Sequence, residues 1–178
     1  MLRIILTYGL VSGAVIILGM LGTMALNKGA PHDSNLWLGY LIMLVALSAV
    51  LVGIRQYRDR QGGGVISFRT GLVLGLGIAA AATVAYVVTW EIYLAMTHYA
   101  FMDQYAASTL EAKRAAGVTG AAYQKLVAEM DEMRRNYANP VFRWGMTAVE
   151  ILPVGVAVAV VSALLLKNPR FLPARQAA

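Results

Sequence analysis

The residues of this sequence with the most chemical potential are acidic side chains inside apolar runs. Glu150 lies within Arg143–Leu166 (RWGMTAVEILPVGVAVAVVSALLL), an otherwise apolar run that also contains Pro153. Glu91 lies near the end of another apolar run, Thr70–Met96. A carboxylate inside a membrane span is costly, so it usually faces protein or a water-filled cavity rather than lipid. These two acids define a candidate intramembrane polar site.

Helical spacing adds basic, hydroxyl and imidazole side chains to this candidate site. Arg143, Thr147 and Glu150 fall on one face of a helix built from the last apolar run. Glu91 and His98, seven residues apart, fall on one face of the preceding helix. Because each helical residue rises about 1.5 Å, counting inward from the ends of the two runs places Glu91 and Glu150 at similar depth.

This arrangement allows two interpretations of the acids besides metal binding. In the first they are structural: Glu91 pairs with Arg143 or a hydroxyl, and Glu150 satisfies backbone groups near Pro153. Proline has no N–H, which leaves the carbonyl of Val149 without its usual partner. In the second, Glu91 and Glu150 share a proton or cation, because neighbouring carboxylates in a low dielectric raise one pKa. Such a pair would act as a relay or gate.

Metal binding is the third interpretation, with Glu91, His98 and Glu150 as ligands together with His32. The chain has only two histidines and no ligand motif that spaces them, so we assign no metal site and no cofactor. The run Gly62–Gly64 lacks the lysine and hydroxyl residue of a phosphate-binding loop. No Ser-His pair, H-E-x-x-H motif or paired aspartate motif lies in the apolar runs, so no catalytic residues are assigned.

The composition indicates a membrane protein. Of 178 residues, 59% are hydrophobic and only 13% are charged, and the mean hydropathy is +0.63. A soluble domain is nearer half apolar and about a quarter charged. The apolar residues gather in separate blocks, which predicts a single polytopic membrane domain. The absence of cysteine excludes disulfides and thiol chemistry.

Four blocks are long enough to cross a bilayer, and they predict an all-α integral membrane four-helix bundle. The predicted spans cover residues 4–26, 36–54, 70–96 and 143–166. Small residues recur at four-residue spacing in three of them: Gly9 and Gly13; Gly71, Gly75, Ala79 and Thr83; Gly77, Ala81 and Ala85; Gly155, Ala159 and Ala163. Because small residues let helix backbones approach closely, the third span, which has two such stripes, is expected at the centre of the bundle.

Residues 97–142, between the third and fourth spans, are the only long hydrophilic segment, and they predict a helical hairpin. Helical spacing over Tyr99–Leu110 indicates that the third helix continues past the bilayer. Thr119 is a candidate N-cap for a second amphipathic helix over Tyr123–Tyr137. Pro140 then separates this helix from the fourth span.

The basic residues predict the orientation. Arg3, the segment Arg55–Arg69 and the tail 167–178 are strongly positive, so both termini are expected in the cytoplasm. The short turn Asn27–Asn35 and the charge-balanced hairpin 97–142 then lie outside. Since the basic residues flank the spans, the net charge of +6 indicates anionic lipid headgroups and not nucleic acid as the partner.

The fourth span also carries a resemblance to a known family. The segment NPVFRWGMTAVEILPVGVAVAVVSALLLK (Asn139–Lys167) resembles the bacterial domain-of-unknown-function 4199 family, and its E-x-x-P-x-G pattern at Glu150–Gly155 is the distinctive part. YGLVSG (Tyr8–Gly13) and YANP (Tyr137–Pro140) are also similar to that family. The resemblance implies a bacterial inner-membrane protein with four spans and about this length. It implies no activity, and no catalytic residue carries over.

Two functions are consistent with these observations. The first is a non-enzymatic membrane component that associates with itself, with lipid or with another membrane protein through its small-residue helix faces and hairpin. The alternative is a small transporter or a proton- or ion-coupled protein that uses Glu150 and Glu91. An intramembrane enzyme ranks third, because no catalytic motif is present.

Overall fold

The structure, a computed structural model, describes residues 1–27 and 36–173, and every regular element among them is a helix. The helices are α1 (Leu2–Asn27), α2 (Leu36–Gln61), α3 (Phe68–Met96), α4 (Phe101–Ala115), α5 (Gly120–Tyr137) and α6 (Pro140–Leu166). α1, α2, α3 and α6 are long and apolar enough to cross a membrane. The predicted all-α fold with four candidate membrane-spanning helices is therefore confirmed.

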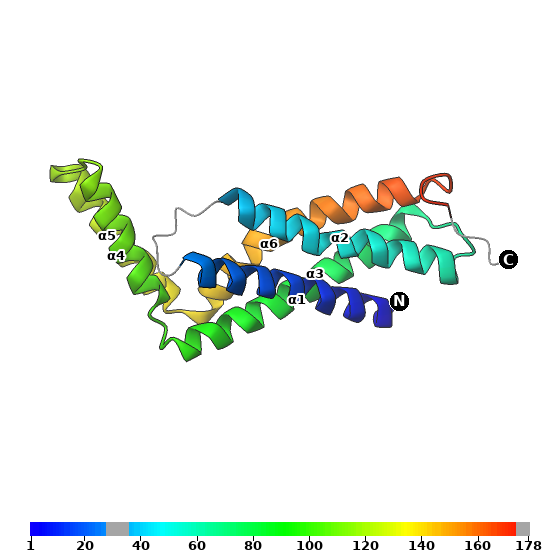
Figure 1. Ribbon diagram of the computed structural model, residues 1–178, viewed down its shortest axis with the longest axis horizontal. Helices are drawn as coiled ribbons and strands as arrows, with labels where there is room; N and C mark the ends of the chain where they lie inside the picture. Colours follow the sequence, from blue (N-terminus) through cyan, green and yellow to red (C-terminus); the bar gives the residue numbers. More distant parts are fainter. Residues whose placement is uncertain (28–35, 174–178) are drawn as a thin grey trace.

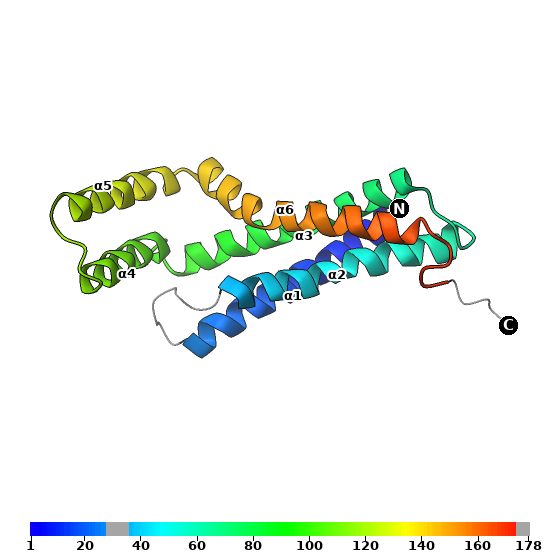
Figure 2. The same cartoon turned by 90° about the horizontal axis from the view of Figure 1, so that it is seen from above.

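The four long helices run side by side, and α4 and α5 project from one end of them as a helical hairpin (Figure 1). The N-terminus, the end of α6 and the loop between α2 and α3 lie at the opposite end, as the turned view also shows (Figure 2). Around the bundle the order is α1, α3, α6, α2, and α2 also touches α3 across the middle. Consecutive helices α2 and α3 are thus diagonal, and α3 has the most extensive contacts.

The small-residue stripe of α3 packs directly on the small-residue stripe of α6. A Cβ built on Gly75 would lie 2.9 Å from the Cβ of Ala159, and one on Gly155 would lie 2.9 Å from the Cβ of Ala79. Gly71 faces Ala163 in the same way, at 3.3 Å. The residue numbers of each pair sum to 234, so the two helices are antiparallel in a constant register. Glycine facing alanine lets these backbones approach closely.

The second stripe of α3 packs on α1. A Cβ on Gly13 would lie 2.7 Å from the Cβ of Ala85, and one on Gly77 would lie 2.8 Å from Cδ1 of Ile5. Gly9 faces Ala81 in the same row. The numbers in each pair differ by 72, which means that α1 and α3 run parallel. The prediction that the third span is central is confirmed, because both of its stripes are covered by other helices.

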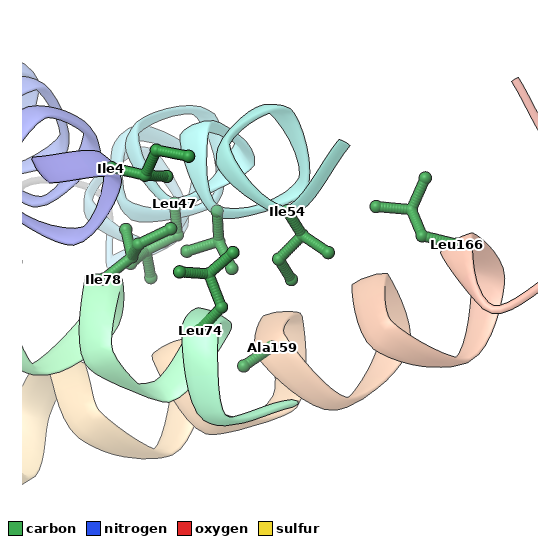
Figure 3. Close-up of a cluster of buried hydrophobic side chains, with 8 residues drawn as sticks. Ile4, Leu47, Ile54, Leu74, Ile78, Ala159 and Leu166 are labelled. Atoms are coloured by element: carbon green, nitrogen blue, oxygen red, sulfur yellow. The ribbon is translucent and has the colours of Figure 1, made fainter. Parts of the chain in front are cut away.

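Apolar side chains from all four long helices fill the space between them (Figure 3). This cluster consists of Ile4, Leu47, Val50, Ile54, Leu74, Ile78, Ala159 and Leu166. The outside of the bundle is apolar as well: Leu10, Val84 and Val149 are each more than 60% exposed. A helix that is apolar on every side belongs in a large core or in a membrane. The exposed faces therefore suit lipid contact.

The third helix does not continue into the hairpin as its spacing predicted. His98 and Tyr99 adopt left-handed backbone angles, with φ of 52° and 57°, and separate α3 from α4. The Tyr99 N–H donates to the Leu94 carbonyl at 2.7 Å and closes the end of α3. The segment 97–100 contains neither glycine nor proline, so helical periodicity alone did not reveal this break.

The hairpin turns where the sequence placed its glycines. Gly117 and Gly120 have φ of +85° and +63°, values that glycine adopts without steric cost. Thr119 occupies the N-cap position of α5, as predicted, but its hydroxyl makes no capping hydrogen bond. At the far end of α5, the Asn139 side chain accepts from the Val141 N–H at 2.9 Å and caps α6, which starts at Pro140.

At the opposite end, α2 extends to Gln61, beyond the predicted end of the second span at Ile54. The glycine run that follows caps this longer helix. The N–H groups of Gly62 and Gly64 both donate to the Arg58 carbonyl, at 3.1 and 3.0 Å. These amides therefore satisfy the end of a helix and do not form a phosphate-binding loop.

Candidate functional site

An ion pair between a buried arginine and a half-buried glutamate joins α3 to α6 at the hairpin end of the bundle. Arg143 Nε lies 2.5 Å from Glu91 Oε1, and its Nη2 lies 2.8 Å from Glu91 Oε2. The side chains are 6% and 22% exposed, respectively. Two parallel charge-assisted hydrogen bonds of this kind are among the strongest polar contacts in proteins. Of the two kinds of partner that the structural interpretation offered Glu91, Arg143 or a hydroxyl, the structure shows Arg143.

The same guanidinium also reaches the hairpin. Its Nη1 donates to the carbonyl of Tyr137, the last residue of α5, at 2.9 Å. Its Cζ lies 5.0 Å from the ring centroid of Tyr99 and 5.7 Å from that of Tyr137. Cations at such distances are attracted to the faces of aromatic rings. Arg143 thus binds α3, the segment between α3 and α4, and the end of α5 to α6.

A second contact at the base of the hairpin is aromatic. The indole N–H of Trp90 on α3 donates to the Tyr137 hydroxyl at 2.8 Å. The Trp90 ring stacks on Tyr93 at 5.3 Å between centroids and meets the edge of Phe101, the first residue of α4, at 4.9 Å. Burial raises the pKa of the Tyr137 hydroxyl, so this group stays neutral while it accepts from the indole. We call Trp90, Glu91, Tyr99, Tyr137 and Arg143 the hairpin clamp.

Glu150 is not one of the five residues of the clamp, although it is close enough for its charge to raise the pKa of the Tyr137 hydroxyl. The ion pair between Glu91 and Arg143 continues the antiparallel register of the glycine contacts, because 91 and 143 also sum to 234. That register places Glu150 level with Val84 of α3. Val84 and Glu91 are seven residues apart, which corresponds to about 10 Å along the helix axis. The inference that Glu91 and Glu150 lie at similar depth is therefore wrong.

Two of the three residues predicted to share a face of the fourth helix are buried. Arg143, Thr147 and Ile151 are buried along one row, whereas Glu150 is exposed. α6 packs on α3 along a four-residue row, and this row passes through Ile151 rather than Glu150. The Thr147 hydroxyl donates to the Arg143 carbonyl at 2.9 Å, one turn back in its own helix. Pro153 lies inside α6 and is exposed.

His98 does not share a helical face with Glu91. It lies beyond the end of α3, in the left-handed segment, and it is exposed. Among residues 1–27 and 36–173, no three His, Cys, Asp or Glu side chains are placed to hold a metal ion. His32, the other histidine of the metal interpretation, lies outside these described residues.

The aromatic members of the clamp were not identified from the sequence. Trp90 and Tyr137 are 47 residues apart, and Tyr99 turns toward Arg143 only because the helix breaks at a left-handed turn. The one available signal was the number of aromatic residues at the two ends of the hydrophilic segment. Chemically, the clamp pairs an acid with a base and satisfies both with hydrogen bonds, so it holds the helices in place.

The comparisons with known proteins identify a family and no activity. The sequence model of a family described as "Protein of unknown function (DUF4199)" matches residues 7–168. No curated protein and no solved structure matches the chain. The predicted resemblance is thereby confirmed over nearly the whole chain.

Proposed function

We propose, for a chain that belongs to the DUF4199 family of proteins of unknown function, a non-enzymatic role in the bacterial inner membrane. In this role the α4–α5 hairpin binds another membrane protein or a second copy of the chain. The observation that carries the proposal is the hairpin clamp, which fastens a projecting hairpin to the bundle by an ion pair. A surface held in a set direction loses little conformational freedom when it binds a partner.

Of the two surfaces considered for association, the small-residue helix faces and the hairpin, the geometry favours the hairpin. The small-residue faces of α1, α3 and α6 pack on each other within one chain and are not available to a partner. In the hairpin, by contrast, no residue of α5 is fully buried. Its apolar residues Tyr123, Leu126, Met130 and Met133 are only half-buried against α4. Half-covered apolar side chains on a projecting element support a role in association.

The alternative, proton- or ion-coupled transport, requires Glu91 and Glu150 to act together. Glu91 is instead engaged by Arg143, and the helix register separates it from Glu150. The centre of the bundle, over the described residues, is filled with apolar side chains such as Leu47, Leu74 and Ile78. These observations favour the association role.

The proposed orientation places the hairpin outside the cytoplasm and both termini inside. This orientation is supported by the arginine and lysine residues gathered where α1 and α3 begin and α2 and α6 end. Because the chain has no cysteine, single-cysteine variants report on one position each. In intact cells, a membrane-impermeant maleimide is expected to label Ala116→Cys, at the exposed hairpin tip, and to label Gln61→Cys only after lysis. The reverse pattern would contradict this orientation.

The association itself is tested by crosslinking in native membranes. A cysteine placed by Ala128→Cys on the exposed side of α5 is expected to form a defined crosslinked species, whereas Gln61→Cys at the opposite end forms none. Adding Glu150→Gln is expected to leave the crosslink unchanged, because the ion pair of Glu91 with Arg143 and the hydrogen bond of Trp90 with Tyr137 hold the clamp. A chain that runs as a bare monomer with no hairpin crosslink, or that loses the crosslink with Glu150→Gln, would sink the proposal.

A further inference from the structure

A buried arginine holds the C-terminal segment against the end of α2. Arg58 Nη1 donates to the Phe171 carbonyl at 2.9 Å, and Nη2 donates to the Leu172 carbonyl. Its Nε donates to Asp59 Oδ1 at 2.8 Å, and the side chain is fully buried. An arginine that satisfies two carbonyls more than 100 residues away fixes where the segment after α6 runs.

This fold gathers basic side chains at one end of the bundle. We define the basic end surface as Arg55, Arg60, Arg69, Lys167 and Arg170. All but Arg55 belong to exposed residues, and the Arg55 side chain is 36% exposed.

The charge of this surface is not balanced by neighbouring acids. In the sequence around it, the only acidic side chain is Asp59, and Asp59 is already held by Arg58 and, at 3.4 Å, by Arg55. The surface therefore presents a net positive charge to its surroundings.

The position of the basic end surface relative to the spans decides which part of the membrane it contacts. The surface lies where α2 and α6 end and α3 begins, at the end of the apolar helices opposite the hairpin (Figure 1). Apolar side chains are interspersed with the charges: Val65 is 61% exposed and Leu172 is 38% exposed. Basic residues mixed with exposed apolar ones suit the boundary between lipid headgroups and acyl chains.

We propose that the basic end surface binds the headgroups of anionic phospholipids and concentrates them around this end of the protein. The occupant is the bilayer itself, because charge, apolar side chains and position at the ends of the spans coincide there. Juxtamembrane arginine and lysine residues attract anionic lipids in this way. The inference is independent of the hairpin, which lies at the other end of the molecule.

The test uses the full chain in vesicles of phosphatidylcholine that contain a small fraction of headgroup-labelled phosphatidylglycerol. Gln61→Cys carries a donor fluorophore at the basic end, and Ala116→Cys carries it at the hairpin tip in a matched sample. Energy transfer from position 61 is expected to report about threefold enrichment of phosphatidylglycerol over equally labelled phosphatidylcholine. High salt is expected to lower this enrichment, because exposed charges are screened.

Matched charge variants distinguish this surface from net charge alone. The triple variant Arg60→Gln, Arg69→Gln and Arg170→Gln is expected to abolish the enrichment. A second triple variant removes the same amount of charge from the hairpin, through Lys113→Gln, Arg114→Gln and Lys125→Gln. This variant is expected to retain the enrichment. Replacing the three arginines by lysine keeps the charge and is expected to retain it too.

Three outcomes would overturn the inference. The first is that position 61 shows no enrichment of phosphatidylglycerol. The second is that both triple glutamine variants lose the enrichment equally. The third is removal of the preference by inorganic phosphate at an ionic strength where chloride has no effect, which would indicate a site for soluble phosphate. Arg58→Gln supplies an independent check, because release of the tail removes Arg170 from the surface and is expected to reduce the enrichment partly.

Discussion

Replacing Gly75 by leucine is expected to lower the free energy of unfolding by about 3 kcal/mol, the upper part of the usual range for an overpacked core. A Cβ at this position would already lie 2.9 Å from the Cβ and 3.2 Å from the Cα of Ala159 on α6. The Cδ1 atom of Ile54 on α2 would lie 3.1 Å from the same Cβ, so a larger side chain meets α2 as well as α6. The helices must separate, and the close packing that holds α3 to α6 in lipid is lost.

Gly145→Leu is the matched control. Gly145 also lies in a long apolar helix, but a Cβ there would meet nothing within 4 Å. We expect this variant to change the stability by less than about 0.5 kcal/mol, as surface substitutions usually do. Both variants would be unfolded by titration with a denaturing detergent and followed by helical circular dichroism. Equal losses at the two positions would mean that α3 and α6 do not pack through this stripe.

Replacing Arg143 is expected to cause the second large loss of stability. Arg143→Gln leaves the Glu91 carboxylate and the Tyr137 carbonyl without the guanidinium that satisfies both. Breaking a buried pair by removing one partner costs about 3 to 5 kcal/mol, and the partial exposure of Glu91 places this variant at the lower limit, about 3 kcal/mol. Arg143→Lys is expected to rescue little, because an ammonium group cannot reproduce the planar fork of hydrogen bonds.

The loss of stability in Arg143→Gln is expected to be largest at the hairpin. Limited proteolysis of Arg143→Gln is expected to cleave the segment between α5 and α6 faster than in the unsubstituted chain, while the bundle stays resistant. The double variant with Glu91→Gln is expected to lose less stability than the two single variants together, because it leaves no unpaired charge. Strictly additive losses, or a hairpin no more susceptible to protease than before, would contradict the role of the hairpin clamp.

The architecture of this protein was predictable because it depends on local sequence properties. A run of about 20 apolar residues spans a bilayer wherever it occurs, and small residues at four-residue spacing form a stripe on any helix. Both properties are visible in Gly71, Gly75 and Ala79 without knowledge of a partner helix. The hairpin was predictable for the same reason, since Gly117 and Gly120 interrupt an amphipathic pattern at the turn.

The candidate site was predictable only in part. Pairing of Glu91 with Arg143 or a hydroxyl was one of the interpretations that the sequence allowed, because a carboxylate inside a span usually faces protein or water rather than lipid. The depth of Glu150 did not follow, because it depends on how far α3 and α6 slide along each other. Counting residues inward from the predicted ends gave one register, and the glycine contacts select another in which Gly75 faces Ala159.

The sequence by itself therefore determined the number of candidate membrane-spanning helices, the faces through which they pack and the presence of a hairpin. Only the tertiary structure decided the contacts that join distant segments. Arg143 meets Glu91 and Tyr137 rather than Glu150, and Arg58 turns inward to hold the tail rather than outward to the headgroups. The physical reason is that helix length and periodicity arise from neighbouring residues. Register and the direction of a long side chain depend instead on packing among residues far apart in the chain.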